Sequence, residues 1–143
     1  MPAALEKADV VIAGAGIIGL SAAVHLLRRQ PLRVVVLERE LTIGLGSTGK
    51  AGGAIRRQFS SPINVALSLL SLPEWERFDA ELDAQVEFRQ HGYMLVTSDE
   101  DAWCSLQQGV AMQRRLGVPA QTVAPEDVSR LWPEARSDDL LGG

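Results

Sequence analysis

The sequence is poor in cysteine and in positive charge, and both shortages exclude classes of function. Cys104 is the single cysteine among 143 residues, so neither an internal disulfide nor a cysteine-built metal site is available. The formal net charge is -4, with 14 basic and 18 acidic residues, which gives no electrostatic footprint for nucleic acid or an anionic membrane. We therefore expect no metal and no nucleic-acid partner. The lone cysteine favours a reducing, cytoplasmic compartment.

The sequence also lacks an apolar run long enough to cross a membrane. Its most apolar stretch, residues 10–27, is interrupted by three glycines, a serine and a histidine. A spanning helix needs about 20 continuous apolar residues. Glu6 and Asp9 precede this stretch, where a signal peptide would carry basic residues. A buried strand followed by a helix explains the stretch better, and we expect no membrane span.

A strand, a helix and a second strand are predicted over the first 40 residues. Residues 8–13 form a short β-branched run that ends at a glycine, which is typical of a strand buried on both faces of a parallel sheet. Residues 17–29 carry an apolar stripe at helical spacing: Ile17, Leu20, Ala23, Val24 and Leu27. Pro31 ends this helix, and residues 33–38 supply the second strand. The sequence therefore predicts an α/β fold that begins with a βαβ unit.

A GxGxxG pattern lies between the first strand and the helix. Its residues are Gly14, Ala15, Gly16, Ile17, Ile18 and Gly19. The first glycine of such a pattern permits a tight turn, the second lets phosphates approach the backbone, and the third lets the helix pack closely. The N–H groups that begin the helix would face a pyrophosphate. The alternative is a glycine-rich turn that binds nothing.

Glu38 ends the second strand, where a carboxylate can accept hydrogen bonds from ribose hydroxyls. An acidic residue there disfavours a 2′-phosphate, and hence NADP. The pattern by itself fits both NAD and FAD.

The rest of the chain alternates loops, helices and short apolar runs. Residues 42–53 contain five glycines and are predicted to be a loop. A helix over residues 62–82 should be kinked or split by Pro73. Its apolar face is expected to comprise Ile63, Ala66, Leu67 and Leu70.

Beyond this helix the pattern changes to short runs. Residues 86–90, 93–97 and 118–123 resemble strands. Asp99 should cap a helix that runs to Leu116 and leaves it at Gly117. Pro125 should begin a last, short helix.

Two blocks of the chain resemble a known family. Residues 8–39 and the segment GLGSTGKAGGAIRRQF at 44–59 resemble the D-amino-acid-oxidase family of FAD-dependent oxidoreductases. This family includes sarcosine oxidase, dimethylglycine and proline dehydrogenases and glycine oxidase. The resemblance implies FAD as cofactor and a Rossmann-like FAD-binding domain over residues 1–84. The beginning of an α+β substrate domain would follow over residues 85–143. Both domains would be truncated, and the chain is expected to be an N-terminal fragment that is inactive alone.

The resemblance also implies roles for single residues. Arg39 would lie near the adenine and ribose, and Ser47 and Thr48 would contact the pyrophosphate. Arg56 matches the arginine that binds the substrate carboxylate in family members that act on amino acids. Alternatively, Arg56 and Arg57 pair with surface acids. No catalytic acid or base can be assigned from the sequence.

The implied function is oxidation of a C–N bond in a secondary or tertiary amine or an amino acid, such as sarcosine, dimethylglycine or proline. Flavin would accept the hydride. The expected partners are this small-molecule substrate and a second subunit. Two alternatives stay open: an FAD dehydrogenase of the hydroxy-acid or glycerol-3-phosphate type, and a binding or assembly protein that has lost turnover.

Overall fold

The computed structural model describes residues 7–143, which form two compact units. The N-terminal unit extends to Ala54, and the C-terminal unit comprises Ile55–Gly143. The predicted boundary after residue 84 separates a cofactor domain from a substrate domain, which is a different division from that of the two compact units. It stays a prediction. Across residues 7–143, no helix is both long and apolar enough to span a bilayer.

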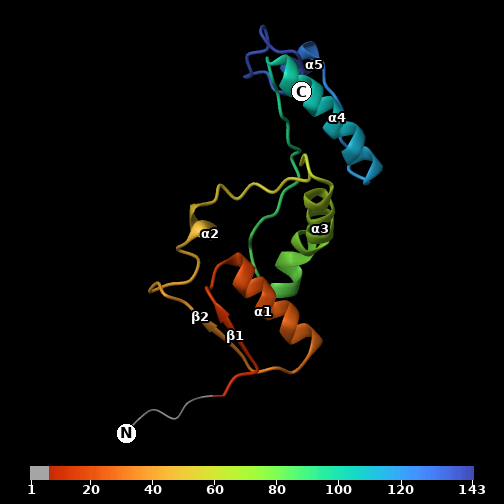
Figure 1. Cartoon of the computed structure of the whole chain (residues 1–143). Coiled ribbons are helices and arrows are strands. Elements are labelled where there is room, and N and C mark those ends of the chain that lie inside the picture. The colour runs from red at the N-terminus through yellow and green to blue at the C-terminus, as the bar shows by residue number, and fades with distance from the viewer. Residues whose placement is uncertain (1–6) are drawn as a thin grey trace. The chain divides into compact units, whose positions relative to one another are not determined.

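The N-terminal unit is built around a βαβ arrangement. Strand β1 (Val10–Ala13), helix α1 (Ile17–Arg29) and strand β2 (Val34–Leu37) follow one another along the chain. The two strands pair in parallel, in a register that aligns the first residue of β1 with the first of β2. Figure 1 shows α1 beside both strands, which it contacts. The predicted α/β unit is therefore confirmed, with helix bounds as expected from the apolar stripe and Pro31.

Two details of this unit differ from the prediction. Only one face of the strands packs against α1, and Val11 on β1 is 58% exposed, so β1 is not buried on both faces. The glycine-rich segment is not entirely loop, because Ser47–Lys50 form the single-turn helix α2. A hydrogen bond from the Gly49 N–H to the Gly44 carbonyl, at 2.7 Å, closes this turn.

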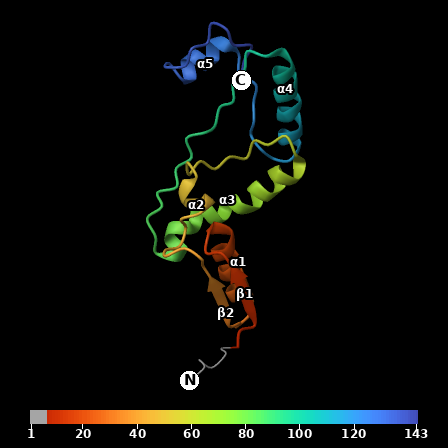
Figure 2. The same ribbon diagram turned by 60° about the vertical axis from the view of Figure 1, so that its left-hand side comes forward.

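The C-terminal unit contains three helices: α3 (Pro62–Leu82), α4 (Glu100–Arg115) and α5 (Pro125–Leu131). Helices α3 and α4 contact each other, and both are labelled in Figure 2. A small core of Val65, Val118 and Ala120 lies between α3 and the segment that follows α4. Its partly buried neighbours are Phe59, Leu69, Val110 and Met112.

The predicted helix ends of this unit are confirmed. The Asp99 carboxylate accepts a hydrogen bond from the Ala102 N–H at 2.8 Å, so it caps α4. Gly117 has φ +92° and leaves α4 in the left-handed conformation that the sequence indicated. Pro125 begins α5.

Helix α3 narrows one expectation and corrects another. It continues through Pro73, which is exposed, so Pro73 does not split the helix in two, and a kink there stays a prediction. The predicted apolar face is wrong: Val65 is fully buried, whereas Ile63 and Leu67 are exposed and Leu70 is 75% exposed. Apolar residues surround the first half of α3 on all sides, so their spacing does not select one face.

The strands predicted in this unit are also wrong. Within the described residues, the segments 86–90, 93–97 and 118–123 form no ladder, and Thr97 makes only an isolated antiparallel bridge with Gly142. Glu87 has φ +53°, a left-handed conformation that a regular strand excludes. The N–H groups of Val86 and Glu87 donate to the Asp79 carboxylate instead of a neighbouring strand.

Candidate functional site

The turn after β1 joins the strand to α1 with almost no space between them. Gly14 has φ +102°, and its N–H donates to the Leu37 carbonyl at 2.7 Å, which ties the turn to the end of β2. A Cβ on Gly19 would lie 2.0 Å from the Gly14 carbonyl oxygen. Only a residue without a Cβ fits at position 19, so the close helix packing that the sequence predicted is confirmed.

The N-terminus of α1 is capped from a distant part of the chain. Gly16 occupies the cap position with extended backbone and has no side chain to accept from the first turn. Instead, the Ile17 N–H donates to the Thr48 hydroxyl oxygen at 3.0 Å. A second bond, from the Gly44 N–H to the Ala15 carbonyl at 3.3 Å, ties the same two segments together. The structure therefore brings both glycine-rich segments to one place, at the positive end of a helix dipole.

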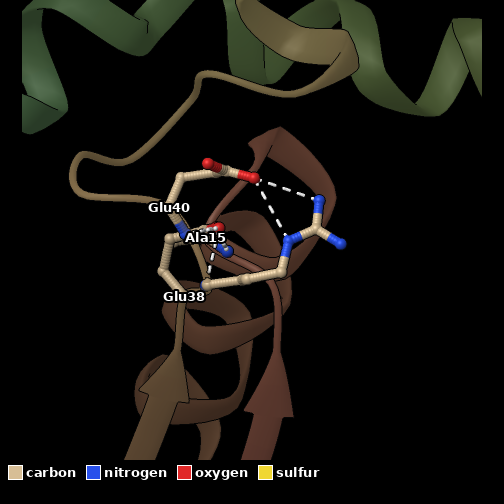
Figure 3. A network of polar contacts seen from close by, with 4 residues as sticks. Ala15, Glu38 and Glu40 are labelled. Carbon is tan, nitrogen blue, oxygen red and sulfur yellow. Dashed lines mark hydrogen bonds and ion pairs between the residues drawn. The ribbon is translucent and has the colours of Figure 1, made fainter.

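Glu38 faces the same turn from the end of β2. Its Oε2 accepts a hydrogen bond from the Ala15 N–H at 2.7 Å (Figure 3). Its Oε1 accepts from the N–H groups of Arg39 and Glu40, at 2.8 and 3.0 Å. The carboxylate is therefore fixed in orientation by three backbone donors.

These bonds also set the charge of Glu38. The N–H of Glu40, and then that of Ala15, lowers the pKa of the Glu38 carboxyl below its ordinary value of 4.5, against a smaller opposing effect of desolvation. Donors that bond to the ionised form stabilise it relative to the protonated acid. Glu38 is consequently a carboxylate at neutral pH, ready to accept further hydrogen bonds.

The other predicted cofactor residues are placed as follows. Ala15, within the turn, is buried. The Ile18 side chain is exposed, so the group that Ile18 offers to a phosphate is its backbone. Arg39 follows Glu38 directly, but its side chain is 91% exposed and pairs with Glu40 at 3.0 Å. Ser47 begins α2 with an exposed side chain beside Thr48. The roles of Arg39 and Ser47 stay predictions.

The residues present fit the ADP half of a dinucleotide. A Cβ on Gly16 would lie 3.1 Å from the Thr48 hydroxyl and would narrow the space before the helix N-terminus, which a pyrophosphate needs. A carboxylate can accept about four hydrogen bonds. Glu38 accepts three from backbone N–H groups, so it can accept one more from a ribose hydroxyl. Glycine, backbone N–H, hydroxyl and carboxylate are the groups such a ligand requires.

A pocket of about 590 Å³ lies within the C-terminal unit. Its wall includes Arg56, Arg57, His91, Tyr93 and Gln113. Within residues 7–143, no group of three or more histidine, cysteine, aspartate or glutamate side chains is placed to hold a metal ion.

Arg56 and Arg57 form no ion pair with an acid within residues 7–143. The ion pairs of these residues involve other arginines, so the alternative that the two neutralise surface acids finds no support here. The Arg56 guanidinium instead lies 5.0 Å from the centre of the Phe59 ring and 5.8 Å from that of Tyr93. An unpaired guanidinium on a pocket wall is a suitable partner for a carboxylate.

Sequence reasoning missed three residues around Arg56: Phe59, Tyr93 and Gln113. Gln113 is 7% exposed, and its Nε2 donates to the Phe59 carbonyl at 3.1 Å. The position of Phe59, three residues after Arg56, was a visible signal in the sequence. Nothing in the sequence indicated that Gln113, on α4, would reach the same segment.

Comparison with known proteins gives a consistent picture. Residues 9–143 match the protein family described as DAO, FAD dependent oxidoreductase. Mouse FAD-dependent oxidoreductase domain-containing protein 1 is 40% identical over 139 residues, which cover 90% of this chain and 28% of the mouse protein. The sarcosine oxidase subunit beta of Rhodobacter capsulatus is 23% identical over 132 residues, covering 92% of this chain and 32% of that subunit.

Among solved structures, L-proline dehydrogenase from P. horikoshii matches 96% of this chain with a TM-score of 0.85 and 29% identity. The match covers 36% of that chain. The present chain thus spans roughly a third of the length of these proteins. The matches confirm the predicted α/β fold and the family resemblance.

Proposed function

The chain belongs to the DAO family of FAD-dependent oxidoreductases, and we propose that the full-length protein binds FAD and oxidises the C–N bond of an amine or amino acid. The observation that carries the cofactor proposal is the meeting of three segments in the N-terminal unit. Ala15 bonds to Glu38, and Ile17 bonds to Thr48, although 23 and 31 residues separate the partners. A turn without a ligand would not require this arrangement of glycines, carboxylate and hydroxyl.

Each part of this site has a distinct task toward FAD. The N–H groups that begin α1, together with the helix dipole, would bind the pyrophosphate. The Thr48 hydroxyl accepts from Ile17 and keeps its own proton to donate to a phosphate oxygen. Glu38 would accept from the ribose, and its negative charge would repel a 2′-phosphate.

The substrate proposal rests on Arg56. Its planar guanidinium can bind a carboxylate through two parallel hydrogen bonds, which orients an amino acid as well as holding it. The chemistry that flavin would supply is acceptance of a hydride from the carbon beside the amine nitrogen, which leaves an imine that water hydrolyses. Two relatives, named a sarcosine oxidase subunit and a proline dehydrogenase, support a substrate of this class.

The cofactor is tested by titrating the purified full-length protein with FAD and following flavin fluorescence, with NAD as competitor. We expect Glu38→Ala to weaken FAD binding about ten- to hundredfold, because it removes hydrogen bonds to a charged acceptor. Glu40→Ala is the matched control, since Glu40 carries the same charge two residues away but pairs with Arg39. Equal loss in both variants, or preferential binding of NAD, would contradict the proposed site.

The substrate is tested by adding sarcosine, L-proline or L-lactate to the FAD-loaded protein without oxygen. We expect an amine to bleach the flavin absorbance. If only L-lactate bleached the flavin, the substrate would be a hydroxy acid and the proposed amine substrate would be wrong. FAD binding without bleaching by any member of a broad amine and hydroxy-acid panel would favour a binding or assembly protein.

A cytoplasmic location and a partner subunit complete the proposal. The Rhodobacter relative is by name one subunit of its enzyme, which supports an association of this kind. The mass of the native complex, measured by light scattering, and the location of the tagged protein test these two expectations.

A further inference from the structure

Arg56 is surrounded by side chains that can fix its orientation. The centres of the Phe59 and Tyr93 rings lie 5.0 and 5.8 Å from its guanidinium carbon, both within the range of cation–π attraction. Phe59 belongs to the same segment as Arg56, whereas Tyr93 comes from the loop between α3 and α4. Two separate segments therefore meet at one guanidinium.

Helix α4 contributes a third contact to this arrangement. The Gln113 side chain is buried, and its Nε2 donates to the Phe59 carbonyl at 3.1 Å. The Gln113 Oε1 has no hydrogen-bond partner in the described residues, so the bond to Phe59 is the one that orients the amide. Gln113 thus fixes the backbone that carries the Phe59 ring.

The two ring contacts can orient the Arg56 guanidinium without occupying its hydrogen-bond donors. A guanidinium donates hydrogen bonds in its own plane, whereas aromatic rings attract it through their faces. Ring contacts therefore restrict the side chain while leaving its N–H groups available to a carboxylate. A long, exposed arginine without such contacts would lose more conformational freedom on binding.

We propose that Phe59 and Tyr93 are positioning residues that hold Arg56 ready for a carboxylate ligand, and that Gln113 fixes Phe59 for this purpose. The inference rests on the proposed role of Arg56 in substrate binding. It extends that role by making the affinity for carboxylate depend on two rings that need not touch the substrate.

The test uses the full-length, FAD-loaded protein and the perturbation of its visible flavin spectrum by acetate, with acetamide as the uncharged analogue. Tyr93→Leu removes the ring, and Tyr93→Phe keeps it. We expect Tyr93→Leu to weaken acetate binding roughly 2- to 30-fold, the range that one cation–π contact supports. Tyr93→Phe should bind acetate as the wild type does, and the affinity for acetamide should not change in either variant.

Two arginine variants separate this inference from the proposed function. Arg56→Gln should abolish acetate binding. Arg89→Gln is the matched control, because Arg89 lines the same pocket but its guanidinium is paired with Glu87, and it should have a much smaller effect. If Arg56→Gln loses acetate but Tyr93→Leu binds it normally, the positioning role is overturned and the proposed function stands. If Arg56→Gln binds acetate normally, or the wild type does not bind it, the carboxylate site itself is overturned. A parallel loss of acetate and acetamide in Tyr93→Leu would show a general structural effect and would also overturn the inference.

Discussion

The two units build their candidate sites from different materials. In the N-terminal unit the groups at the site are mostly backbone N–H and carbonyl groups made accessible by glycines, with one carboxylate and one hydroxyl added. In the C-terminal unit they are side chains, and Gln113 reaches Phe59 across 54 positions of sequence. Backbone groups can bind only where the fold allows close approach, whereas side chains reach their partners over a distance. The first site therefore tolerates little added volume, and the second depends on single polar contacts.

The largest test of this contrast is Gly19→Ala. The new Cβ would lie 2.0 Å from the Gly14 carbonyl oxygen, which is backbone and cannot rotate away. We expect a loss of about 3 kcal/mol or more in the free energy of unfolding, together with loss of FAD binding. Urea unfolding and FAD titration measure the two effects.

Gly52→Ala is the control for this change. Gly52 belongs to the same unit, has no atom within 4 Å of an added Cβ, and does not lie in the left-handed region that favours glycine. A stable Gly19→Ala protein would show that the helix can move away from the turn, and the contrast between the units would be lost.

Gln113→Leu tests whether the C-terminal unit depends on a single polar contact. The substitution keeps the approximate volume but leaves the Phe59 carbonyl without its donor. We expect a loss of about 0.5 to 1.5 kcal/mol in the free energy of unfolding, the net contribution of one hydrogen bond, because the bond to the Phe59 carbonyl is only partly buried. Thermal unfolding checks this, and Gln108→Leu on an exposed position of the same helix is the matched control. Equal stability of the two variants would contradict a structural role for this contact.

Thr48→Val tests the one hydroxyl in the backbone-built site. Valine has the same shape but cannot accept from the Ile17 N–H. We expect FAD affinity to fall about tenfold, which corresponds to roughly 1.4 kcal/mol, the order of one hydrogen bond to a charged group. Thr42→Val, on an exposed residue of the same segment, should bind FAD normally. An unchanged affinity of Thr48→Val would show that the Thr48 hydroxyl does not bind FAD, and the site would consist of backbone groups and the Glu38 carboxylate.

The smallest expected effect is the pH dependence contributed by Glu38. Its folded-state pKa is lowered below 4.5, chiefly by the N–H groups of Glu40 and Ala15, so its ionised form stabilises the fold. This contribution is present above the unfolded-state pKa and is lost as the pH falls through the lower, folded-state value. We therefore expect the difference in unfolding free energy between wild type and Glu38→Gln to shrink from about pH 5 downwards. Urea unfolding over this range measures it, and a difference that grows on acidification would contradict the assignment.

The accuracy of sequence-based prediction differed between local features and long-range strand pairing. The bounds of α1 were predicted correctly because its apolar stripe, the preceding glycines and Pro31 all act locally. The cap of α4 at Asp99 was predicted for the same reason. The strands predicted at 86–90, 93–97 and 118–123 were wrong, because a β-branched or aromatic run becomes a strand only where another strand pairs with it.

The candidate sites show the same division. The glycine pattern and Glu38 were recognisable because their spacing along a βαβ unit is dictated by the geometry of strand, turn and helix. Thr48 was identified by resemblance, but its contact with Ile17 came only from the folded chain. The contact of Arg56 with Phe59, three residues away, was missed. Its contact with Tyr93 was not predictable, since no local rule links residues that meet through a loop.

By itself, the sequence determined the βαβ unit, the helix caps and the family of this protein, because these depend on the order and spacing of neighbouring residues. Only the tertiary structure decided which distant groups bond to one another: Thr48 to Ile17 at the start of α1, and Gln113 to Phe59. The physical reason is that such contacts depend on how the chain returns to the same place after tens of residues. That return is fixed by packing and hydrogen bonding over the whole unit, and no local pattern of residues encodes it.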